Sequence, residues 1–250
     1  MDFTLKTYED LLKSLIDQNY TFLTFEEFLK SESDKTIILR HDVDLMPYNS
    51  LAFAKIQHRH NVKGVYYFRA VKESWNENII KEISNLGHEI GYHYENLSFC
   101  KGDYNESIKD FKYNLKRLRK LAPVSTICMH GSPLSKFDSR DLWTKYNYSD
   151  FDIKGEPYFD IDFNNVHYFT DTGRKWDGEK VSVRDKVKTN NDITFSSTKD
   201  IIRSAKNGTL PKKIMFTFHP QRWNDNLFYW VKELILQNLK NIIKRLILVK

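Results

Sequence analysis

The chain has 250 residues, 40% hydrophobic and 29% charged, which suits one sizeable globular domain with a full core. Its formal net charge of +6 leaves room for anionic partners, but the basic residues form no dense run, which argues against a nucleic-acid-binding protein. The two cysteines, Cys100 and Cys128, lack C-x-x-C spacing, which excludes a disulfide framework or a zinc ribbon and predicts buried free thiols in a reducing compartment.

The N-terminal residues show no basic segment followed by an apolar one, so no secretory signal is predicted. No apolar run approaches the ~18 residues needed to cross a membrane. The chain has no linker rich in glycine, serine or proline and no internal repeat. We therefore expect a cytoplasmic protein without a transmembrane segment, folded as a single domain over residues 1–250.

The first part of the chain is predicted to be helical. Apolar residues at helical spacing occur over 7–18 and again over 24–30, and they predict a helical lead-in that occupies residues 1–35. From residue 36 onward, strands and helices are predicted to alternate, with strands at 36–41, 65–68, 88–95 and 125–130 and helices near 48–60, 76–86 and 104–121. Such repeated strand–helix units predict an α/β fold with a parallel sheet, closed or nearly closed into a barrel with outer helices.

The later part of the chain is less regular. We expect a short helix, two strands, a further helix and a last strand, at 138–146, 158–163, 166–170, 198–206 and 213–218. The polar stretch 172–192 between them is a candidate for a loop that covers the site. A long amphipathic helix at 226–246 lies within the C-terminal segment 226–250; its Leu, Ile and Trp face is expected to dock on the barrel, or alternatively to pair with a second subunit.

The strand at 36–41 leads into a cluster of ionisable residues that contains Arg40, His41, Asp42 and Asp44. Because Asp42 and Asp44 are two residues apart, an extended backbone points both carboxylates to the same side. Two carboxylates this close raise the proton affinity of one of them unless a cation compensates. A divalent metal would bind one carboxylate and leave the other as a base, whereas His41 points to the opposite face and is expected to pack or to orient the backbone.

Three further predicted strands end in a histidine, at His93, His130 and His219. In a parallel barrel the carboxyl ends of all strands lie on one rim, so these histidines are expected to converge with Asp42 and Asp44. Imidazole and carboxylate groups together form the nitrogen and oxygen ligand set of a zinc-type site. A divalent metal, most commonly zinc, is therefore the predicted cofactor.

These motifs, in this order, resemble those of the carbohydrate (polysaccharide) deacetylases of the NodB-homology family. The resemblance rests on Asp-x-Asp after the first strand, on Gly-His-Glu-Ile-Gly-Tyr-His at 87–93 and on Phe-Thr-Phe-His at 216–219, and covers roughly residues 36–225. It implies a distorted (β/α) barrel that hydrolyses N- or O-acetyl groups on sugars with the help of a divalent metal.

The resemblance also implies roles for individual residues. Asp42 matches the general base, Asp44 the metal-binding aspartate and His93 the first histidine of a metal-binding His-x-x-x-His pair. His219 matches the histidine that acts as general acid. The segment from Asp171 to Trp176 resembles the motif that shapes the pocket and orients catalytic groups.

The chain departs from the family pattern at Leu97, where the second metal-binding histidine is expected. Zinc needs about three protein ligands in addition to an open position. His130 on the adjacent strand is the first candidate for the missing ligand, and Glu95, on the same strand face as His93, is the second. Leu97 also leaves open a metal-free, non-catalytic relative.

Several arginines and two tryptophans are candidates for contact with the substrate. A guanidinium group can bind a phosphate or carboxylate of the substrate through two parallel hydrogen bonds. The same arginines could equally form ion pairs with acidic residues at the carboxyl-terminal rim of the barrel. The candidates are Arg40, Arg174, Arg184 and Arg222. Trp176 and Trp223 could stack on sugar rings or simply pack in the core.

The expected activity is metal-dependent hydrolysis of an acetamide, or an acetyl ester, on a sugar of surface-polysaccharide synthesis. The positive charge and the absence of a signal predict a substrate that is nucleotide- or lipid-linked, because such sugars are anionic and are made inside the cell. The alternative is a non-catalytic sugar- or sugar-nucleotide-binding protein on the same barrel, which Leu97 favours.

Overall fold

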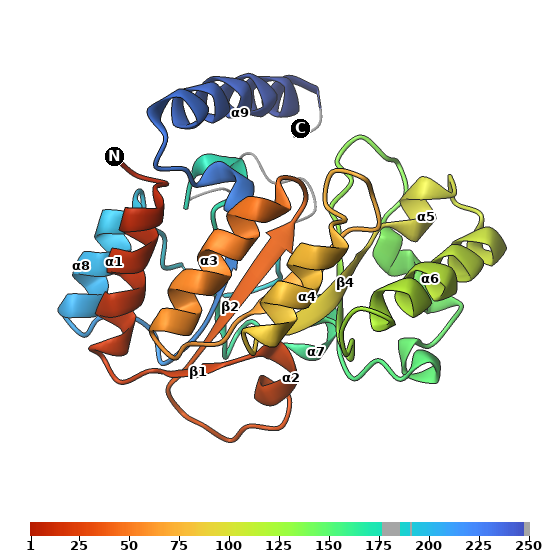
Figure 1. Cartoon of the computed structure of the whole chain (residues 1–250), viewed down its shortest axis with the longest axis horizontal. Coiled ribbons are helices and arrows are strands. Elements are labelled where there is room, and N and C mark those ends of the chain that lie inside the picture. Colours follow the sequence, from red (N-terminus) through yellow and green to blue (C-terminus); the bar gives the residue numbers. More distant parts are fainter. Residues whose placement is uncertain (177–185, 191, 248–250) are drawn as a thin grey trace.

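The computed structural model describes residues 1–176, 186–190 and 192–247 (Figure 1). Within this part of the chain, one seven-stranded parallel sheet follows the order β5-β4-β3-β2-β7-β6, with β1 beside β2. The strands are β1 Thr21–Leu23, β2 Thr36–Val43, β3 Val65–Phe68, β4 Glu89–Tyr94, β5 Ile127–Met129, β6 His167–Thr170 and β7 Lys213–Phe218.

Helices surround the sheet, and Figure 1 shows α8, α1, α3 and α4 side by side along one face of it. The α-helices are α1 Leu5–Ile16, α2 Phe25–Phe28, α3 Pro47–Arg59, α4 Glu77–Asn85, α5 Asn96–Phe99, α6 Tyr104–Arg119, α7 Pro157–Asp160, α8 Thr198–Lys206 and α9 Leu227–Ile247. Short 3-10 helices occur at η1 Ser139–Thr144, η2 Tyr148–Phe151, η3 Thr172–Arg174 and η5 Pro220–Arg222.

The register of the sheet brings the carboxyl ends of the central strands to one edge. All eight residues of β2 are buried, as expected for a strand covered on both faces. Its last residues pair with two neighbours at once, since His41 lies opposite Tyr66 of β3 and Phe218 of β7. The predicted parallel strands with outer helices are confirmed. In the described residues β5 and β6 are the two edges of the sheet, which makes it a curled half-barrel and not a closed ring.

Local sequence signals explain where the elements begin. Thr24 starts α2 with a capping box, in which its side chain and that of Glu27 each accept a hydrogen bond from the other's backbone N–H. Gly91 in β4 leaves space for a neighbouring ring, because a Cβ atom there would lie 2.2 Å from the side chain of Tyr67. The ring of Tyr67 can therefore pack against Gly91, and its centroid lies 6.4 Å from that of His93.

The strand predicted at 158–163 is wrong, since α7 occupies its first part. Pro157 suits the first turn of a helix, and the side chain of Glu156 caps it by accepting the backbone N–H of Tyr158 at 2.6 Å. The strand β1 and the short helix α5 were not predicted. Of the two cysteines, Cys128 is buried as expected but Cys100 is half-buried.

Part of the predicted covering loop at 172–192 lies outside the described residues, including 177–185, Arg184 and residue 191. The described start of that stretch forms η3. No helix of the described chain is long and apolar enough to span a membrane.

The C-terminal helix α9 packs in the opposite sense to the prediction. Its buried residues are the polar Gln237 and Asn241, while Ile235, Leu239 and Ile242 are each more than half exposed. The amide of Asn241 donates to the carbonyl oxygen of Gly173 in η3 at 2.8 Å. Of the predicted docking face, Trp230 does pack on the protein, against Arg174 and the carbonyl oxygen of Asp2. The Leu and Ile residues named above face outward instead, because polar contacts to η3 hold the helix by its other side.

Candidate metal and catalytic site

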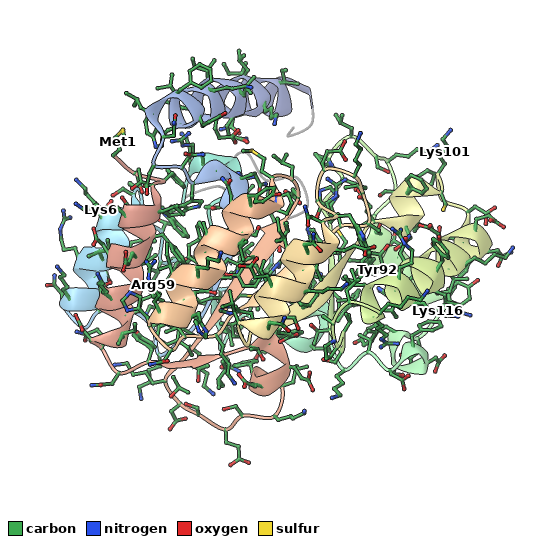
Figure 2. The ribbon with its side chains drawn as sticks, viewed as in Figure 1. Met1, Lys6, Arg59, Tyr92, Lys101 and Lys116 are labelled. Atoms are coloured by element: carbon green, nitrogen blue, oxygen red, sulfur yellow. The ribbon has the colours of Figure 1, made fainter. Side chains whose placement is uncertain are left out.

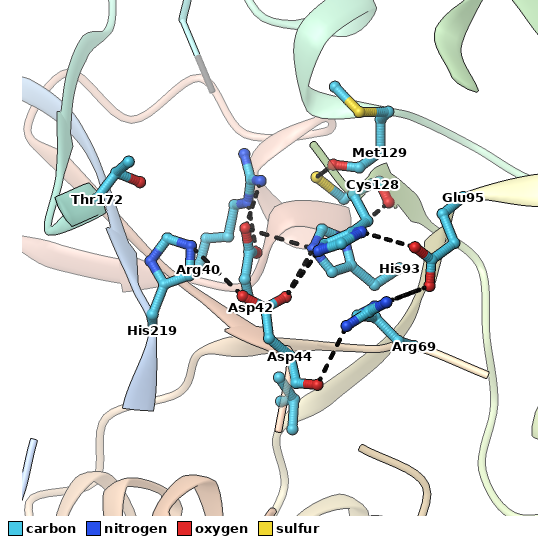
Figure 3. A network of polar contacts seen from close by, with 12 residues as sticks. Arg40, Asp42, Asp44, Arg69, His93, Glu95, Cys128, Met129, Thr172 and His219 are labelled. Atoms are coloured by element: carbon cyan, nitrogen blue, oxygen red, sulfur yellow. Dashed lines mark hydrogen bonds and ion pairs between the residues drawn. The ribbon is translucent and has the colours of Figure 1, made fainter. Parts of the chain in front are cut away.

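The carboxyl-terminal edge of the sheet contains a cavity of about 450 Å³. Five of the residues singled out in the sequence line it together: Asp42, Asp44, His93, His130 and His219. They come from the ends of β2, β4, β5 and β7, so the parallel register has gathered residues that are far apart in the chain. Figure 3 shows how Asp42, Asp44, His93 and His219 converge. The far wall is provided by α9.

Asp44 lies between two imidazole nitrogens. Its Oδ1 is 3.7 Å from Nε2 of His93 and 3.5 Å from Nε2 of His130. Ligands held at about 2.0–2.1 Å from a tetrahedral zinc ion lie about 3.3–3.4 Å apart, so both separations fit a shared ion after small adjustments. On these two separations we favour Asp44, His93 and His130 as the candidate ligand set, with His130 as the candidate for the third ligand.

The outer nitrogens of both histidines are fixed by hydrogen bonds. Nδ1 of His93 lies 2.9 Å from the carbonyl oxygen of Cys128, which can only accept, so Nδ1 carries the proton and Nε2 presents a lone pair. Nδ1 of His130 lies 2.8 Å from Oε2 of Glu95. Metal-binding histidines are oriented in this way by a carbonyl or a carboxylate on the second ring nitrogen.

The two carboxylate oxygens of Asp44 have different surroundings. Oδ2 accepts a hydrogen bond from the amide of Gln221 at 3.2 Å. Oδ1 is buried and has no hydrogen-bond partner among the described residues. Burial alone would raise the pKa of Asp44, but the nearby His130, His219 and His93 outweigh it and lower that pKa. An ionised, buried oxygen that faces two imidazole nitrogens is suited to a divalent cation.

Glu95, the second candidate for the third ligand, and Leu97, the position of the missing histidine, have different roles. Glu95 binds His130 through one oxygen and Arg69 through the other, at 2.8 Å each, and these partners lower its pKa to about 2 despite burial. It therefore orients His130 and is not itself placed as a ligand. Leu97 is 1% exposed in α5 and belongs to the apolar interior.

A second group of possible ligands shares His93. Donor atoms of Asp42, His93 and Cys128 lie within 4.8 Å of one another. Both oxygens of Asp42 are already bound by Arg40, and a metal there would have to compete with that ion pair. We therefore favour the set with Asp44 and His130, whose facing atoms are not engaged in this way.

Arg40 and Asp42 form a buried bidentate ion pair. Nε and Nη2 of Arg40 donate to the two oxygens of Asp42 at 2.8 and 2.7 Å, and both side chains are nearly inaccessible to solvent. The pair fixes the direction of the Asp42 carboxylate, whose Oδ2 lies 3.6 Å from Nε2 of His93. Each carboxylate oxygen retains a lone pair, so Asp42 can still accept a proton in the cavity.

His219 is held by the buried carboxylate of Asp171, the residue that directly follows β6. Asp171 accepts hydrogen bonds from Nδ1 of His219 at 2.6 Å, from Nη1 of Arg222 at 2.8 Å and from Nε1 of Trp223 at 2.6 Å. Burial and Arg222 lower the pKa of His219, but Asp171 and Asp44 outweigh them and raise it above its usual value. Nε2 of His219 faces the metal side of the cavity, 3.9 Å from Oδ2 of Asp44.

The predicted substrate-contacting residues divide into two groups. Arg40 and Arg222 line the cavity, where a substrate could reach them. Each also forms an ion pair within the protein, Arg40 with Asp42 and Arg222 with Asp171, which was the alternative to substrate binding. Trp176 and Trp223 are 4% and 0% exposed, so neither presents a ring face on which a sugar could stack. Arg174 is also buried, and its guanidinium donates to the carbonyl oxygen of Trp230 in α9. For these last three residues the structure corrects the expectation, because packing and α9 already occupy their contact surfaces.

His41 lies outside the cavity, as expected. It is fully buried, stacks on Tyr66 at 4.1 Å between ring centroids and accepts a hydrogen bond from Gln57. Its place behind β2 makes it part of the core.

Three residues of the site were missed in the sequence. Arg69 directly follows β3 and binds Glu95, Gln221 binds Asp44, and the hydroxyl of Tyr158 accepts a hydrogen bond from Arg40 at 3.3 Å. Arg69 could have been found by treating β3 like the other strands and looking at the residue just after its end. Tyr158 gave no such signal, because its segment was assigned to a strand.

No protein-family model matches this chain, and no curated protein matches it either. Solved structures that resemble it belong to carbohydrate esterase family 4. A Streptococcus mutans CE4 esterase is 13% identical, with 89% of this chain and 88% of that chain covered and a TM-score of 0.47. Bacillus subtilis PdaA, a family 4 carbohydrate esterase, is 15% identical, with 92% and 83% covered and a TM-score of 0.40.

A CE4 family pseudoenzyme from Bacillus anthracis is also similar, at 14% identity and a TM-score of 0.44. The match covers 86% of this chain but 63% of that one, so the chain spans less than two thirds of that protein.

Proposed function

We propose that this protein is a metal-dependent carbohydrate deacetylase, a hydrolase that removes an acetyl group from an N-acetylated or O-acetylated sugar. The observation that carries the proposal is the position of Asp44 Oδ1, which faces Nε2 of both His93 and His130 without a hydrogen-bond partner among the described residues. A candidate base and a candidate acid flank this group in the same cavity. The resemblance to NodB-homology deacetylases in the sequence motifs supports the same function.

Asp44, His93 and His130 would hold a divalent ion, most simply zinc, because a carboxylate and two imidazoles form a usual zinc ligand set. When bound, such an ion polarises a carbonyl group and lowers the pKa of a bound water. Glu95 and the carbonyl oxygen of Cys128 keep the two imidazoles in the orientation that binding requires.

We assign the proton transfers to Asp42 and His219, which flank the proposed metal ligands in the cavity. Asp42, held by Arg40, would accept the proton of the attacking water. His219, whose pKa is raised by Asp171, would carry a proton at Nε2 and donate it to the leaving amine. Arg40 also has a free donor, since its Nη1 has no hydrogen-bond partner among the described residues and the side chain lines the cavity.

A nucleotide- or lipid-linked sugar, an intermediate of surface-polysaccharide synthesis in the cytoplasm, is the substrate class we favour. The cavity volume of about 450 Å³ falls within the range of small-ligand sites. Arg222 and Lys240 line it, and the chain as a whole carries a net charge of +6, which suits an anionic substrate.

A second candidate function is sugar binding without turnover on the same fold. Leu97 favours it, because the family motif has a metal-binding histidine at this position. This second function requires that the cavity bind the acetylated sugar without releasing acetate from it.

The experiment is acetate release from nucleotide-linked N-acetylhexosamines by the zinc-loaded chain, with Asp42→Asn as the inactive control and calorimetry as the measure of binding. Deacetylation that is lost in Asp42→Asn supports the enzyme. Binding by the wild-type chain without acetate release, over the whole panel of substrates, supports the binding protein instead.

A further inference from the structure

The helix α9 turns its apolar side away from the protein. Six of its apolar residues are between 38% and 71% exposed: Leu227, Phe228, Val231, Ile235, Leu239 and Ile242. From Phe228 onward they are three or four residues apart, which places them on one side of a helix of 21 residues that begins at Leu227. Figure 1 shows this helix apart from the sheet, and Figure 2 shows side chains that point outward along its length.

The opposite side of α9 is largely polar and is occupied by the protein itself; its apolar exceptions are Trp230, which packs against Arg174, and Ile243, which lines the cavity. Gln237 and Asn241 are buried and hydrogen-bonded to each other, and Asn241 binds the backbone of η3. Glu233, Gln237 and Lys240 also line the cavity. The helix is thus anchored by its polar side, and turning the apolar side inward would break these contacts.

The charges of α9 are unevenly distributed. Its sequence contains four basic residues, Lys232, Lys240, Lys244 and Arg245, and one acidic residue, Glu233. Glu233 faces the cavity, whereas Lys232 is exposed and lies at helical spacing beside Phe228 and Ile235 on the apolar side. The outward surface therefore combines apolar side chains with positive charge and has no acidic residue to pair with Lys232 along the described helix.

We propose that the outward side of α9 docks on an anionic lipid bilayer surface. A helix with an apolar face and flanking lysines lies in the plane of the interface, where its apolar side chains enter the acyl boundary and its lysines reach the headgroups. Lys232 can extend its ammonium group to an anionic headgroup while its methylenes stay among the apolar residues. The net charge of +6 adds long-range attraction to such a surface.

A second copy of this chain fits the same surface less well. Pairing two outward faces would bury Lys232 of each copy against apolar side chains, and α9 offers no acidic residue on that side to compensate. The inference does not depend on the proposed hydrolysis. Because α9 also forms one wall of the cavity, docking would hold the cavity beside the membrane surface.

The test is flotation of the full chain with vesicles of phosphatidylcholine, with and without a quarter of phosphatidylglycerol. We expect binding to the anionic vesicles, weakened by salt, and little binding to neutral ones. The double variant Ile235→Asp/Leu239→Asp should lower the bound fraction by about tenfold or more, since two half-exposed apolar side chains lose their burial. The control Phe99→Asp/Tyr113→Asp makes the same change at exposed sites on α5 and α6 and should leave binding unchanged.

Four results would overturn the proposal. They are the absence of binding to anionic vesicles, equal binding to neutral ones, equal loss in both double variants, and a lipid-free dimer, measured by light scattering, that Ile235→Asp/Leu239→Asp dissociates. The last result would assign the surface to a second copy of the chain. Because both pairs of substitutions lie on exposed positions, each variant is expected to fold, and circular dichroism checks this.

Discussion

The Nδ1 atom of His219 lies 2.6 Å from Oδ1 of Asp171, and this carboxylate is fully buried. The contact leaves Nε2 of His219 to face the cavity, so a proton held there could be donated to a leaving group. Asp171 thus acts through His219 as a positioning residue, in the same way as the carboxylates that orient catalytic histidines in other hydrolases.

The Asp171→Asn variant should therefore lose general acid catalysis. We expect kcat for an N-acetylated sugar to fall by about 10²-fold or more, with KM little changed, because the acid acts on the leaving amine. A nitrophenyl acetate ester is the internal control, since its leaving group needs no proton and its hydrolysis should fall far less. Equal losses on both substrates would assign Asp171 a purely structural role.

Replacing Arg40 should separate catalysis from metal binding. Arg40→Lys keeps the charge but cannot make both parallel hydrogen bonds to Asp42, so kcat should fall while the metal content stays. Arg40→Met leaves a buried carboxylate without its partner and should lower the free energy of unfolding by about 3–5 kcal/mol. Urea unfolding and elemental analysis measure both effects. Loss of metal in Arg40→Lys would instead place Asp42 among the ligands.

His41 predicts a pH-dependent contribution to stability. Burial lowers its pKa from 6.5 to about 3; the titratable groups that act on it are His88, which lowers the pKa further, and Asp42 and Asp171, which raise it. The unfolded chain therefore binds a proton that the folded chain does not. The stability is fully present above pH 6.5 and is lost as pH falls toward 3, by at most about 1.4 kcal/mol per pH unit.

The measurement is the difference in unfolding free energy between the wild type and His41→Phe from pH 7 to pH 4. The difference isolates His41 from Glu156, whose pKa is raised to about 7 by burial and whose contribution has the opposite sign. His41→Phe should be less stable at pH 7 because Val65 and Gln57 lose a hydrogen bond, and the two curves should converge as the pH falls. Parallel curves would contradict the assignment.

The Leu97→Ala variant tests whether the proposed metal site is independent of residue 97, where the family motif has a metal-binding histidine. Leu97→Ala removes a buried side chain of α5 and should lower the free energy of unfolding by about 2–5 kcal/mol. Metal content, measured on the folded variant at low temperature, should be unchanged. A loss of metal from a folded Leu97→Ala chain would show that α5 supports the site more directly than its contacts suggest.

The convergence of Asp44, His93 and His130 could be predicted from the sequence because parallel strands share one carboxyl edge. Any ionisable residue just after a buried apolar run is therefore a candidate for the same place. The partners of these residues were harder to predict. From the sequence, Glu95 was a candidate metal ligand. Only the pairing of β5 with β4 shows that it binds Nδ1 of His130, the ring nitrogen that does not face Asp44.

The orientation of α9 could not be predicted for a different reason. An amphipathic pattern identifies two faces of a helix, but it does not say which face meets the protein. The usual expectation places the apolar face inward. Here the polar Asn241 finds a partner in the backbone of η3, a segment whose conformation depends on Gly173 at a φ of 74°. The hydrogen bond between Asn241 and Gly173 cannot be predicted from the sequence pattern of α9 or of η3 taken separately.

The most direct test of the central claim is the metal content of protein purified in parallel as wild type, His93→Ala, His130→Ala and Cys128→Ser. The wild type should contain about one zinc or similar divalent ion per chain, both histidine variants should lose it, and Cys128→Ser should keep it. Metal retained in His130→Ala and lost in Cys128→Ser would contradict the site and transfer it to Asp42, His93 and Cys128.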